Sequence, residues 1–341
     1  MNASRVLLLS ARETRATPDT DLAAVVSELF AALGAQPACT VVHHEIVGIG
    51  DVERAVRRFR PHVVFNTCEA IGGQSALEPV VPLLLDRLGV EYTGNRAACL
   101  RSCLRKSDTT DALRLAGVPV PASVRLTEAS SELPAPLRFP VIVKPEREDG
   151  SVGIDGASVA TDGPTLHRAV GRVIEELSQP ALVQEYIAGR EIAVALLGWP
   201  TPRVLPPGEI EFIEASFAGR PHVLTYASKW DATSPDYQGT RSISAATDPA
   251  VRARVHGVAL RAFAALHMRD YGRVDLRLDA RGRPFVVDVN PNCDLSSDAG
   301  FAKAARRAGL DHAALVGEIL RCALRRAATR AGSDASTRVA S

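Results

Sequence analysis

The feature that most constrains the fold is a pair of apolar strands in the segment GRVDLRLDARGRPFVVDVNPN, residues 272–292. A short glycine-containing turn joins the two strands, which is typical of a β-hairpin. With that turn, Asp275 lies opposite Asp288. Because side chains alternate between the two faces of a strand, Arg273 and Asn290 lie on the same face as the two acids. The sequence therefore predicts one strongly polar hairpin face.

The other face of this hairpin is apolar, and we predict that it belongs to the core; its residues are Val274, Leu276, Leu278, Val287 and Val289. On the polar face, two carboxylates and an amide oxygen are hard ligands suited to Mg²⁺ or Mn²⁺. The alternative is a solvated face with an Asp–Arg ion pair. Facing acids in an apolar hairpin repel each other unless a cation lies between them, which favours the metal site.

Lysine is rare in this chain. There are four lysines, Lys106, Lys144, Lys229 and Lys303, which leaves 36 arginines among the 40 basic residues. Because arginine supplies the general positive charge, we expect a lysine where a compact ammonium is needed, for instance as a point charge on phosphate. Lys303 lies in an Ala/Arg-rich predicted helix, and we interpret it as incidental. The surroundings of the other three favour a role.

Lys144 ends an apolar strand in FPVIVKPEREDGSVGIDG, residues 139–156, and a Gly/Ser loop follows it. The backbone N–H groups freed by Gly150 and Gly153 would cradle phosphate oxygens, and Lys144 would reach the same phosphates. A plain hairpin is the alternative for the loop taken alone.

A second connector, in ALVQEYIAGREIAV (residues 181–194), joins two predicted strands. Its backbone groups would face the edge of an adenine, and Glu191 would accept ribose hydroxyls. An interdomain hinge that binds no ligand is the alternative on this segment alone. The connector therefore supports a nucleotide site only together with the lysines and the hairpin.

Strand and helix patterns alternate in the first hundred residues, which predicts a parallel α/β domain. Strands are expected at 5–10, 41–46 and 63–66, and helices at 22–33, 52–59 and 78–88. We place the domains at 1–96, 97–187 and 188–330, and we predict a disordered tail at 331–341.

The overall composition excludes several functional classes. The net charge of +1 provides no basic field for nucleic acid. No apolar run is long enough for a membrane span or a signal peptide, so we expect a cytoplasmic protein. Six cysteines without a CxxC pair argue against structural zinc. There is no GxSxG motif, and Cys293 is interpreted as a small structural residue.

Together these segments resemble the ATP-grasp superfamily, specifically the D-alanine–D-alanine ligase-like carboxylate–amine ligases, from about Val63 to Leu320. The resemblance includes the stretch VVFN…GGQS…LLLDRLGVEYTGN. It implies an α/β and α+β ATP-grasp fold of three subdomains. The first would be a parallel-sheet substrate domain, and the other two α+β domains would clasp ATP. The resembling enzymes are commonly homodimers, so a homodimer is expected.

The resemblance also implies a role for each residue of the site. Those implied to bind the ATP phosphates or close the lid are Lys106, Lys144, Ser151 and Lys229. Those implied to surround the adenine and ribose are Gln184, Glu185, Ile187 and Glu191. Those implied to hold two Mg²⁺ (or Mn²⁺) ions are Asp275, Asp288 and Asn290. Arg273 would stabilise charge on the transferred phosphoryl group, so Arg273, Lys229 and Ser151 are the catalytic candidates.

The substrate segments depart from the family pattern. The second-substrate loop usually reads Asn, two residues, then Pro-Gly-Met-Thr, but here it reads NPNCDLSSDAGF. The serine that receives the second substrate's carboxylate falls at Ala299, and only Ser296 and Ser297 lie close. In the first domain, Glu69 replaces a histidine and Gln74 replaces an acid. These four polar residues are the substrate-binding candidates, and the changes argue against a cell-wall D-alanine–D-alanine ligase.

The function expected from this pattern is ATP-dependent amide formation between two small molecules, a carboxylate (an amino acid) and an amine. An acyl phosphate would be the intermediate, and ADP and phosphate would be released. The alternatives are an ATP-grasp kinase, a non-catalytic nucleotide-binding module and a true D-alanine–D-alanine ligase. Product analysis separates them, because only a ligase yields an amide.

Overall fold

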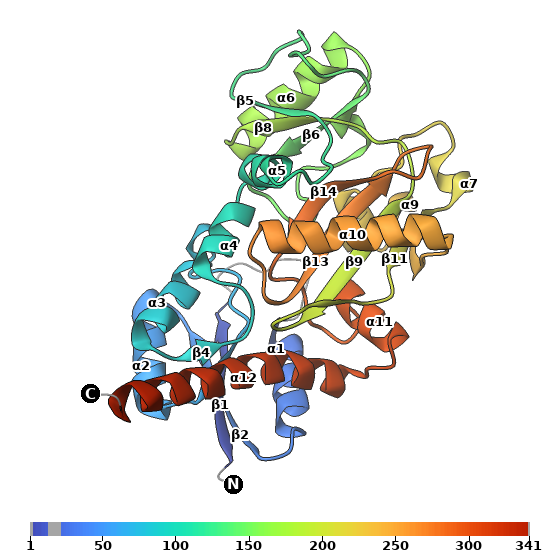
Figure 1. The fold of residues 1–341 in the computed structure, drawn as a ribbon. Helices are drawn as coiled ribbons and strands as arrows, with labels where there is room; N and C mark the ends of the chain where they lie inside the picture. Colours follow the sequence, from blue (N-terminus) through green and yellow to red (C-terminus); the bar gives the residue numbers. More distant parts are fainter. Residues whose placement is uncertain (1–2, 13–21, 340–341) are drawn as a thin grey trace.

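The computed structural model describes residues 3–12 and 22–339 (Figure 1). The amino-terminal domain is built on a parallel sheet in the order β2-β1-β3-β4. Its strands are β1 (Ser4–Ala11), β2 (Cys39–Ile46), β3 (Val63–Asn66) and β4 (Glu91–Tyr92). Its helices are α1 (Leu22–Gly34), α2 (Ile49–Phe59) and α3 (Val80–Leu88), with a 3₁₀ turn η1 (Ser75–Leu77) before α3. The predicted alternation of strands and helices is confirmed.

The central domain contains a small antiparallel sheet in the order β5-β8-β6-β7. The strands are β5 (Ser123–Leu126), β6 (Val141–Pro145), β7 (Val159–Ala160) and β8 (Ala181–Glu185). Its helices are α5 (Lys106–Leu115) and α6 (Gly163–Leu177), with the 3₁₀ turn η2 (Gly156–Ser158). α4 (Ala97–Cys103), which the sequence analysis did not predict, connects it to the first domain.

The carboxyl-terminal domain contains an antiparallel sheet in the order β12-β11-β9-β13-β14, with β10 paired to β9. The strands are β9 (Glu191–Gly198), β10 (Arg203–Val204), β11 (Gly208–Phe212), β12 (Thr240–Ser244), β13 (Asp270–Leu278) and β14 (Pro284–Asn290). The helices are α7 (Glu214–Phe217), α8 (Tyr226–Trp230), α9 (Pro235–Gln238), α10 (Pro249–Ala265), α11 (Gly300–Arg307) and α12 (His312–Val339). Figure 1 shows the central domain at one end of this sheet and α11 toward the other.

The hairpin of β13 and β14 has the predicted register: Asp275 pairs with Asp288, and Arg273 pairs with Asn290. The prediction that Val287 lies in the core is wrong. The register shifts after Asp275, so that Leu276 pairs with Val286 and not with Val287. A bulge of this kind reverses the direction of the following side chains, and Val286 occupies the core while Val287 lines a cavity.

α12 connects the carboxyl-terminal domain to the amino-terminal domain. Its Arg326 forms a buried ion pair with Asp270 at the start of β13 and a further pair, of 3.1 Å, with Glu91 of β4. The same helix packs against α1, as Figure 1 shows. Charged groups buried in this way must be paired and hydrogen-bonded, so the network fixes the amino-terminal domain against the large sheet.

The predicted disordered tail differs from the structure. α12 continues as a helix to Val339, and only 340–341 lie outside the described residues. The segment after 322 is rich in alanine and arginine, which are strong helix formers. Among the helices of the described part of the chain, none is long and apolar enough to cross a membrane.

Candidate active site

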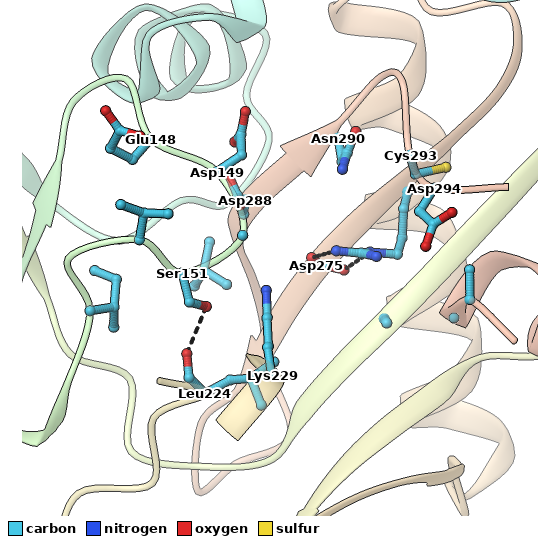
Figure 2. Close-up of a pocket in the computed structure, with 18 of the residues that line it drawn as sticks. Glu148, Asp149, Ser151, Leu224, Lys229, Asp275, Asp288, Asn290, Cys293 and Asp294 are labelled. Carbon is cyan, nitrogen blue, oxygen red and sulfur yellow. Dashed lines mark hydrogen bonds and ion pairs between the residues drawn. The ribbon is translucent and has the colours of Figure 1, made fainter. Parts of the chain in front are cut away.

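A cavity of about 630 Å³ lies where the three domains meet (Figure 2). The first domain contributes Thr67 and Glu69, and the central domain contributes the loop after β6. The large sheet contributes the polar face of the β13–β14 hairpin. All four lysines of the chain line this one cavity. The volume falls in the range of small-molecule sites in proteins.

Lys144 and Lys106 differ in their partners. Lys144 Nζ donates hydrogen bonds to Gln184 Oε1 (3.0 Å) and to the carbonyl of Val287 (3.1 Å), and burial lowers its pKa to about 8. No ion pair joins it to a carboxylate of the described residues. Lys106 Nζ instead lies 3.5 Å from Asp149 and 3.6 Å from Asp288. A partly buried ammonium that forms no ion pair is suited to bind an anionic ligand.

The polar hairpin face contains the Asp–Arg ion pair that the sequence allowed as the alternative to a metal site. Arg273 forms a bidentate pair with Asp275, with both N–O distances 2.8 Å. Asp288 takes no part in that pair. Burial would raise the pKa of Asp288, but Lys106, Lys144 and Arg273 together hold it below its usual value, so the carboxylate stays ionised. Asn290 Oδ1 accepts a hydrogen bond from the amide of Asn292 (3.0 Å).

A metal site on this face would use two carboxylates and one amide oxygen. Among residues 3–12 and 22–339 there is no cluster of three or more His, Cys, Asp or Glu side chains able to hold a metal. Asn290 is therefore essential to the predicted set. Asp275, Asp288 and Asn290 all line the cavity, so the structure brings the three predicted ligands to one place.

The Gly/Ser loop after β6 is fixed by contacts with the large sheet's domain. Ser151 has φ +65°, and Gly150 and Gly153 also have positive φ, which is the backbone freedom for which glycine is used. Ser151 Oγ donates to the carbonyl of Leu224 (2.8 Å), as Figure 2 shows. Trp230 Nε1 donates to the carbonyl of Gly150 (2.9 Å). The loop thus covers the cavity from the central domain.

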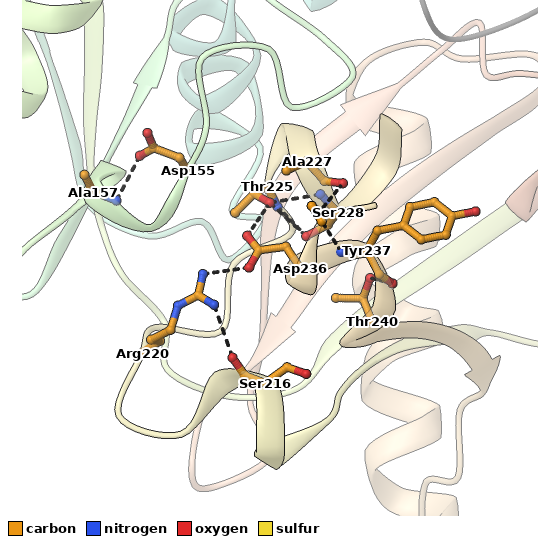
Figure 3. Close-up of polar contacts among 11 residues, drawn as sticks. Asp155, Ala157, Ser216, Arg220, Thr225, Ala227, Ser228, Asp236, Tyr237 and Thr240 are labelled. Atoms are coloured by element: carbon orange, nitrogen blue, oxygen red, sulfur yellow. Dashed lines mark hydrogen bonds and ion pairs between the residues drawn. The ribbon is translucent and has the colours of Figure 1, made fainter. Parts of the chain in front are cut away.

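Lys229 lies on the short helix α8, and Figure 3 shows the polar network at the start of this helix. Thr225 caps α8 by accepting from the amide of Ser228 (3.0 Å), and its own hydroxyl donates to Asp236 (2.8 Å). Asp236 also pairs with Arg220 (2.7 Å). Burial lowers the pKa of Lys229, and Arg273 lowers it further. The network stabilises the segment that carries Lys229.

The connector between β8 and β9 lines the cavity with Glu185, Ile187 and Glu191. Gln184 is also on the wall, but its amide oxygen accepts from Lys144 and thereby orients that lysine. Glu191 lies 3.5 Å from Arg277 Nη1. Three of the four residues implied for adenine and ribose thus lie on the cavity wall without contacting Lys144, and the fourth, Gln184, positions Lys144.

Comparison with known proteins decides the family. The family described as "D-ala D-ala ligase C-terminus" matches residues 116–321, more than half of the chain. The chain belongs to the ATP-grasp D-alanine–D-alanine ligase family. It is 31% identical to the D-alanine–D-alanine ligase of Desulforudis audaxviator over 290 residues, which cover 83% of this chain and 89% of that one.

Two further matches agree with this family. An uncharacterized protein of Sinorhizobium fredii is 35% identical over 264 residues, which cover 77% of this chain and 75% of that one. The structure of the Bacillus anthracis D-alanine–D-alanine ligase complexed with ATP matches with a TM-score of 0.74 at 20% identity, covering 96% and 100% of the two chains. The match confirms the predicted ATP-grasp fold.

Within this D-alanine–D-alanine ligase-family fold, the charged cavity residues that the sequence analysis missed include Arg277 and Asp149. Arg277 donates to the carbonyls of His222 (2.7 Å) and Gly189 (2.8 Å). The alternation that placed Arg273 and Asp275 on one face extends to residue 277, so the signal was present. Asp149, in the Gly/Ser loop, pairs with Lys106, and only a packed structure reveals that partner.

The substrate candidates of this family member divide into two groups. Glu69 lines the cavity, whereas Gln74 is exposed and lies off the wall. Ser296 and Ser297 are also off the wall. Ser296 Oγ donates to Asp294 (2.9 Å), and Ser297 donates its amide (2.9 Å) and hydroxyl (3.2 Å) to Glu28 of α1. The two serines stabilise the loop that they belong to.

Lys303 requires a correction. The sequence interpretation treated it as incidental, but its side chain lines the cavity from α11 together with Ala299 and Gly300. Residues 299, 300 and 303 share one face of a helix because their spacing is close to a full turn. That spacing, and not the composition of the helix, indicates that Lys303 faces the same side as Ala299 and Gly300.

Proposed function

We propose that this protein is an ATP-dependent carboxylate–amine ligase that joins two small molecules into an amide, most simply a dipeptide. The observation that carries the proposal is Lys144. It is a partly buried ammonium without an ion-pair partner among the described residues, and it lies in the same cavity as Asp275 and Asp288. This combination of an anion site and hard oxygen ligands suits a magnesium–nucleotide complex.

ATP fits the residues that line the cavity. Lys106, Lys144 and Lys229 would neutralise its phosphates, with the Gly/Ser loop and Ser151 covering them. Glu185 and Ile187 would line the adenine, and Glu191 would accept the ribose hydroxyls. Gln184 would act through Lys144. The ATP complex of the Bacillus anthracis relative supports this assignment, because the two folds match over nearly their whole lengths.

Two Mg²⁺ (or Mn²⁺) ions fit the donor set of Asp275, Asp288 and Asn290. The pKa of Asp288 is held down by its cationic neighbours, so an ionised oxygen ligand is present at neutral pH. When bound, the metal neutralises charge on the phosphates and orients them. The donors are oxygens only, which favours these ions over zinc.

The reaction would proceed in two steps. A substrate carboxylate oxygen attacks the γ-phosphorus of ATP, the bond to the ADP oxygen breaks, and an acyl phosphate forms. The amine of the second substrate then attacks the acyl carbon, phosphate leaves, and the amine loses a proton. Arg273 would stabilise the negative charge in both steps. The loop carrying Ser151 and the segment carrying Lys229 would exclude water, which otherwise hydrolyses the acyl phosphate.

No protein nucleophile is required by this scheme, and Cys293 does not act as one. Its thiol lines the cavity, but burial raises its pKa to about 12, so the thiolate is not populated at neutral pH. The kinase and the non-catalytic module remain the alternatives from other classes. Retention of Lys144, Asp275, Asp288 and Asn290 in one cavity favours catalysis, since a binding module has no need of metal ligands.

ADP release, measured across paired amino acids of both chiralities with mass analysis of the products, tests the proposal. We expect an amide together with ADP and phosphate. A stable phosphorylated product would establish a kinase, and binding of ATP without turnover would establish a module. D-alanine belongs in the screen, because the 31% identical relative is a D-alanine–D-alanine ligase. The expected homodimer is checked by light scattering on the same preparation.

A further inference from the structure

α11 brings a cation to the part of the cavity that the nucleotide assignment does not use. Gly300 and Lys303 of this helix, with the N-cap residue Ala299, line the wall next to Asp294 and Leu295. A Cβ on Gly300 would lie 4.0 Å from Arg273 Nη1, so the helix begins beside the guanidinium at the reaction centre. Figure 2 shows Asp294 and Cys293 on the opposite side of Asp275 from Ser151 and Asp149.

Lys303 has no acidic partner in the part of the chain that the structure describes: its backbone amide donates to Ala299, and its ammonium forms no ion pair. This contrasts with Lys106, which lies between two carboxylates. The neighbouring arginines of α11 also have protein partners. Arg306 donates to the carbonyl of Ser297 (3.0 Å), and Arg307 donates to that of Pro206 (3.2 Å). Lys303 is the cation of α11 that is available to a ligand.

We propose that Lys303 binds the carboxylate of the amine substrate, so that the acceptor is an amino acid and not a neutral amine. The inference rests on the proposed ligase function. When two amino acids are joined, the carboxylate of the first becomes the acyl phosphate, and the carboxylate of the second is the one that remains. A compact ammonium that lines the wall beyond Arg273 supplies its counter-charge.

The rest of this wall suits the same substrate. Asp294 carries the opposite charge a few residues from the start of α11, and its carboxylate lines the cavity while it accepts from Ser296. A zwitterion presents both signs to such a wall, whereas a neutral amine would leave Lys303 without a counter-charge. Lys303 is therefore a specificity-determining residue for the acceptor.

The test compares each acceptor amino acid with its carboxamide, which keeps the amine and the side chain and removes the negative charge. The full-length enzyme is assayed by ADP release and amide formation. For the wild type we expect kcat/KM to favour the acid by about 10- to 100-fold, the usual effect of a charge-assisted hydrogen bond. In Lys303→Met this preference should disappear through a higher KM for the acid, with the KM for ATP unchanged. Lys303→Arg should restore part of it.

Arg306→Met is the matched control. It removes a cation from the same helix, but the guanidinium of Arg306 already has a protein partner, the carbonyl of Ser297. It should leave the preference for the acid unchanged. If the preference survives in Lys303→Met, or if acid and carboxamide lose activity equally, the assignment of Lys303 is wrong while the ligase function stands. A wild-type enzyme that forms no amide with any pair would overturn the ligase function and this inference with it.

Discussion

The two halves of the cavity are built differently. In the half assigned to the nucleotide, Lys144 and Arg273 project from strands and are fixed by their neighbours: Gln184 orients Lys144, and Asp275 orients Arg273. In the half assigned to the substrates, the wall is formed by a loop and by α11. The serines predicted to bind substrate there are hydrogen-bonded to other protein groups, as Ser297 is to Glu28. In the proposed function, the hairpin strands thus supply the metal ligands and Arg273, and a loop and a helix end, which tolerate change, surround the acceptor.

The largest loss of activity, and the strongest test of this contrast, is expected from a substitution of Asp288. Asp288→Ala removes an ionised oxygen from the predicted metal site and should lower kcat by about 1,000-fold or more. Steady-state ADP release at saturating Mg²⁺ measures it. Glu211→Ala is the control, since Glu211 is an exposed acid of the same sheet off the cavity wall. Full activity of the Asp288 variant would disprove the metal assignment.

Lys144→Met should raise the KM for ATP by about 100-fold, because a charge-assisted contact to phosphate is lost. The pH dependence follows from the same residue. Burial lowers the pKa of Lys144 to about 8, and only the protonated form attracts phosphate. kcat/KM for ATP should therefore fall as the pH rises through about 8, and Lys144→Arg should abolish the fall. An identical pH profile in wild type and Lys144→Arg would assign the titration to another group.

A smaller effect is expected at Glu28, which holds α1 against the loop of the substrate half. Glu28→Ala removes the acceptor of both Ser297 hydrogen bonds and should lower the free energy of unfolding by about 1 kcal/mol. The KM for the amine substrate should rise a few-fold while the KM for ATP is unchanged. Chemical denaturation and steady-state kinetics measure the two. A larger change in the KM for ATP would show that the halves are not independent.

The smallest effect is expected at Gln74. Its side chain is exposed and lies off the cavity wall, so Gln74→Ala should change every kinetic constant by less than about twofold. Glu69→Gln is the informative partner, because Glu69 lines the cavity. A large loss from Gln74→Ala would mean that the loop of residues 71–75 moves onto the substrate.

Much of the nucleotide half was predictable because it depends on local pattern. A glycine turn and strict alternation gave the pairing of Asp275 with Asp288 and of Arg273 with Asn290. That Val286, and not Val287, faces the core was not predictable in this way. A bulge adds one residue to a strand where packing demands it, and the apolar sequence Phe285–Val287 reads the same in either register.

The substrate half was less predictable because its residues act through distant partners. Ser297 was a reasonable candidate from its position in the loop, but its partner Glu28 lies on a helix 269 residues earlier. Asp149 likewise has a partner in another element. Lys303 differs again: its helix is rich in alanine and arginine, so composition alone does not distinguish it, whereas its spacing from Ala299 places it on the face toward the cavity.

The clustering of all four lysines in one cavity gives the protein an unusual chemical surface. Reagents that acylate primary amines find few targets on its exterior, since arginine guanidinium groups do not react with them. Besides the amino terminus, covalent labelling is thus confined to the cavity. ATP or an amino acid, when bound, should protect some of these lysines from acylation. The number of protected lysines then reports how many of the four ammonium groups each ligand covers, without any substitution in the chain.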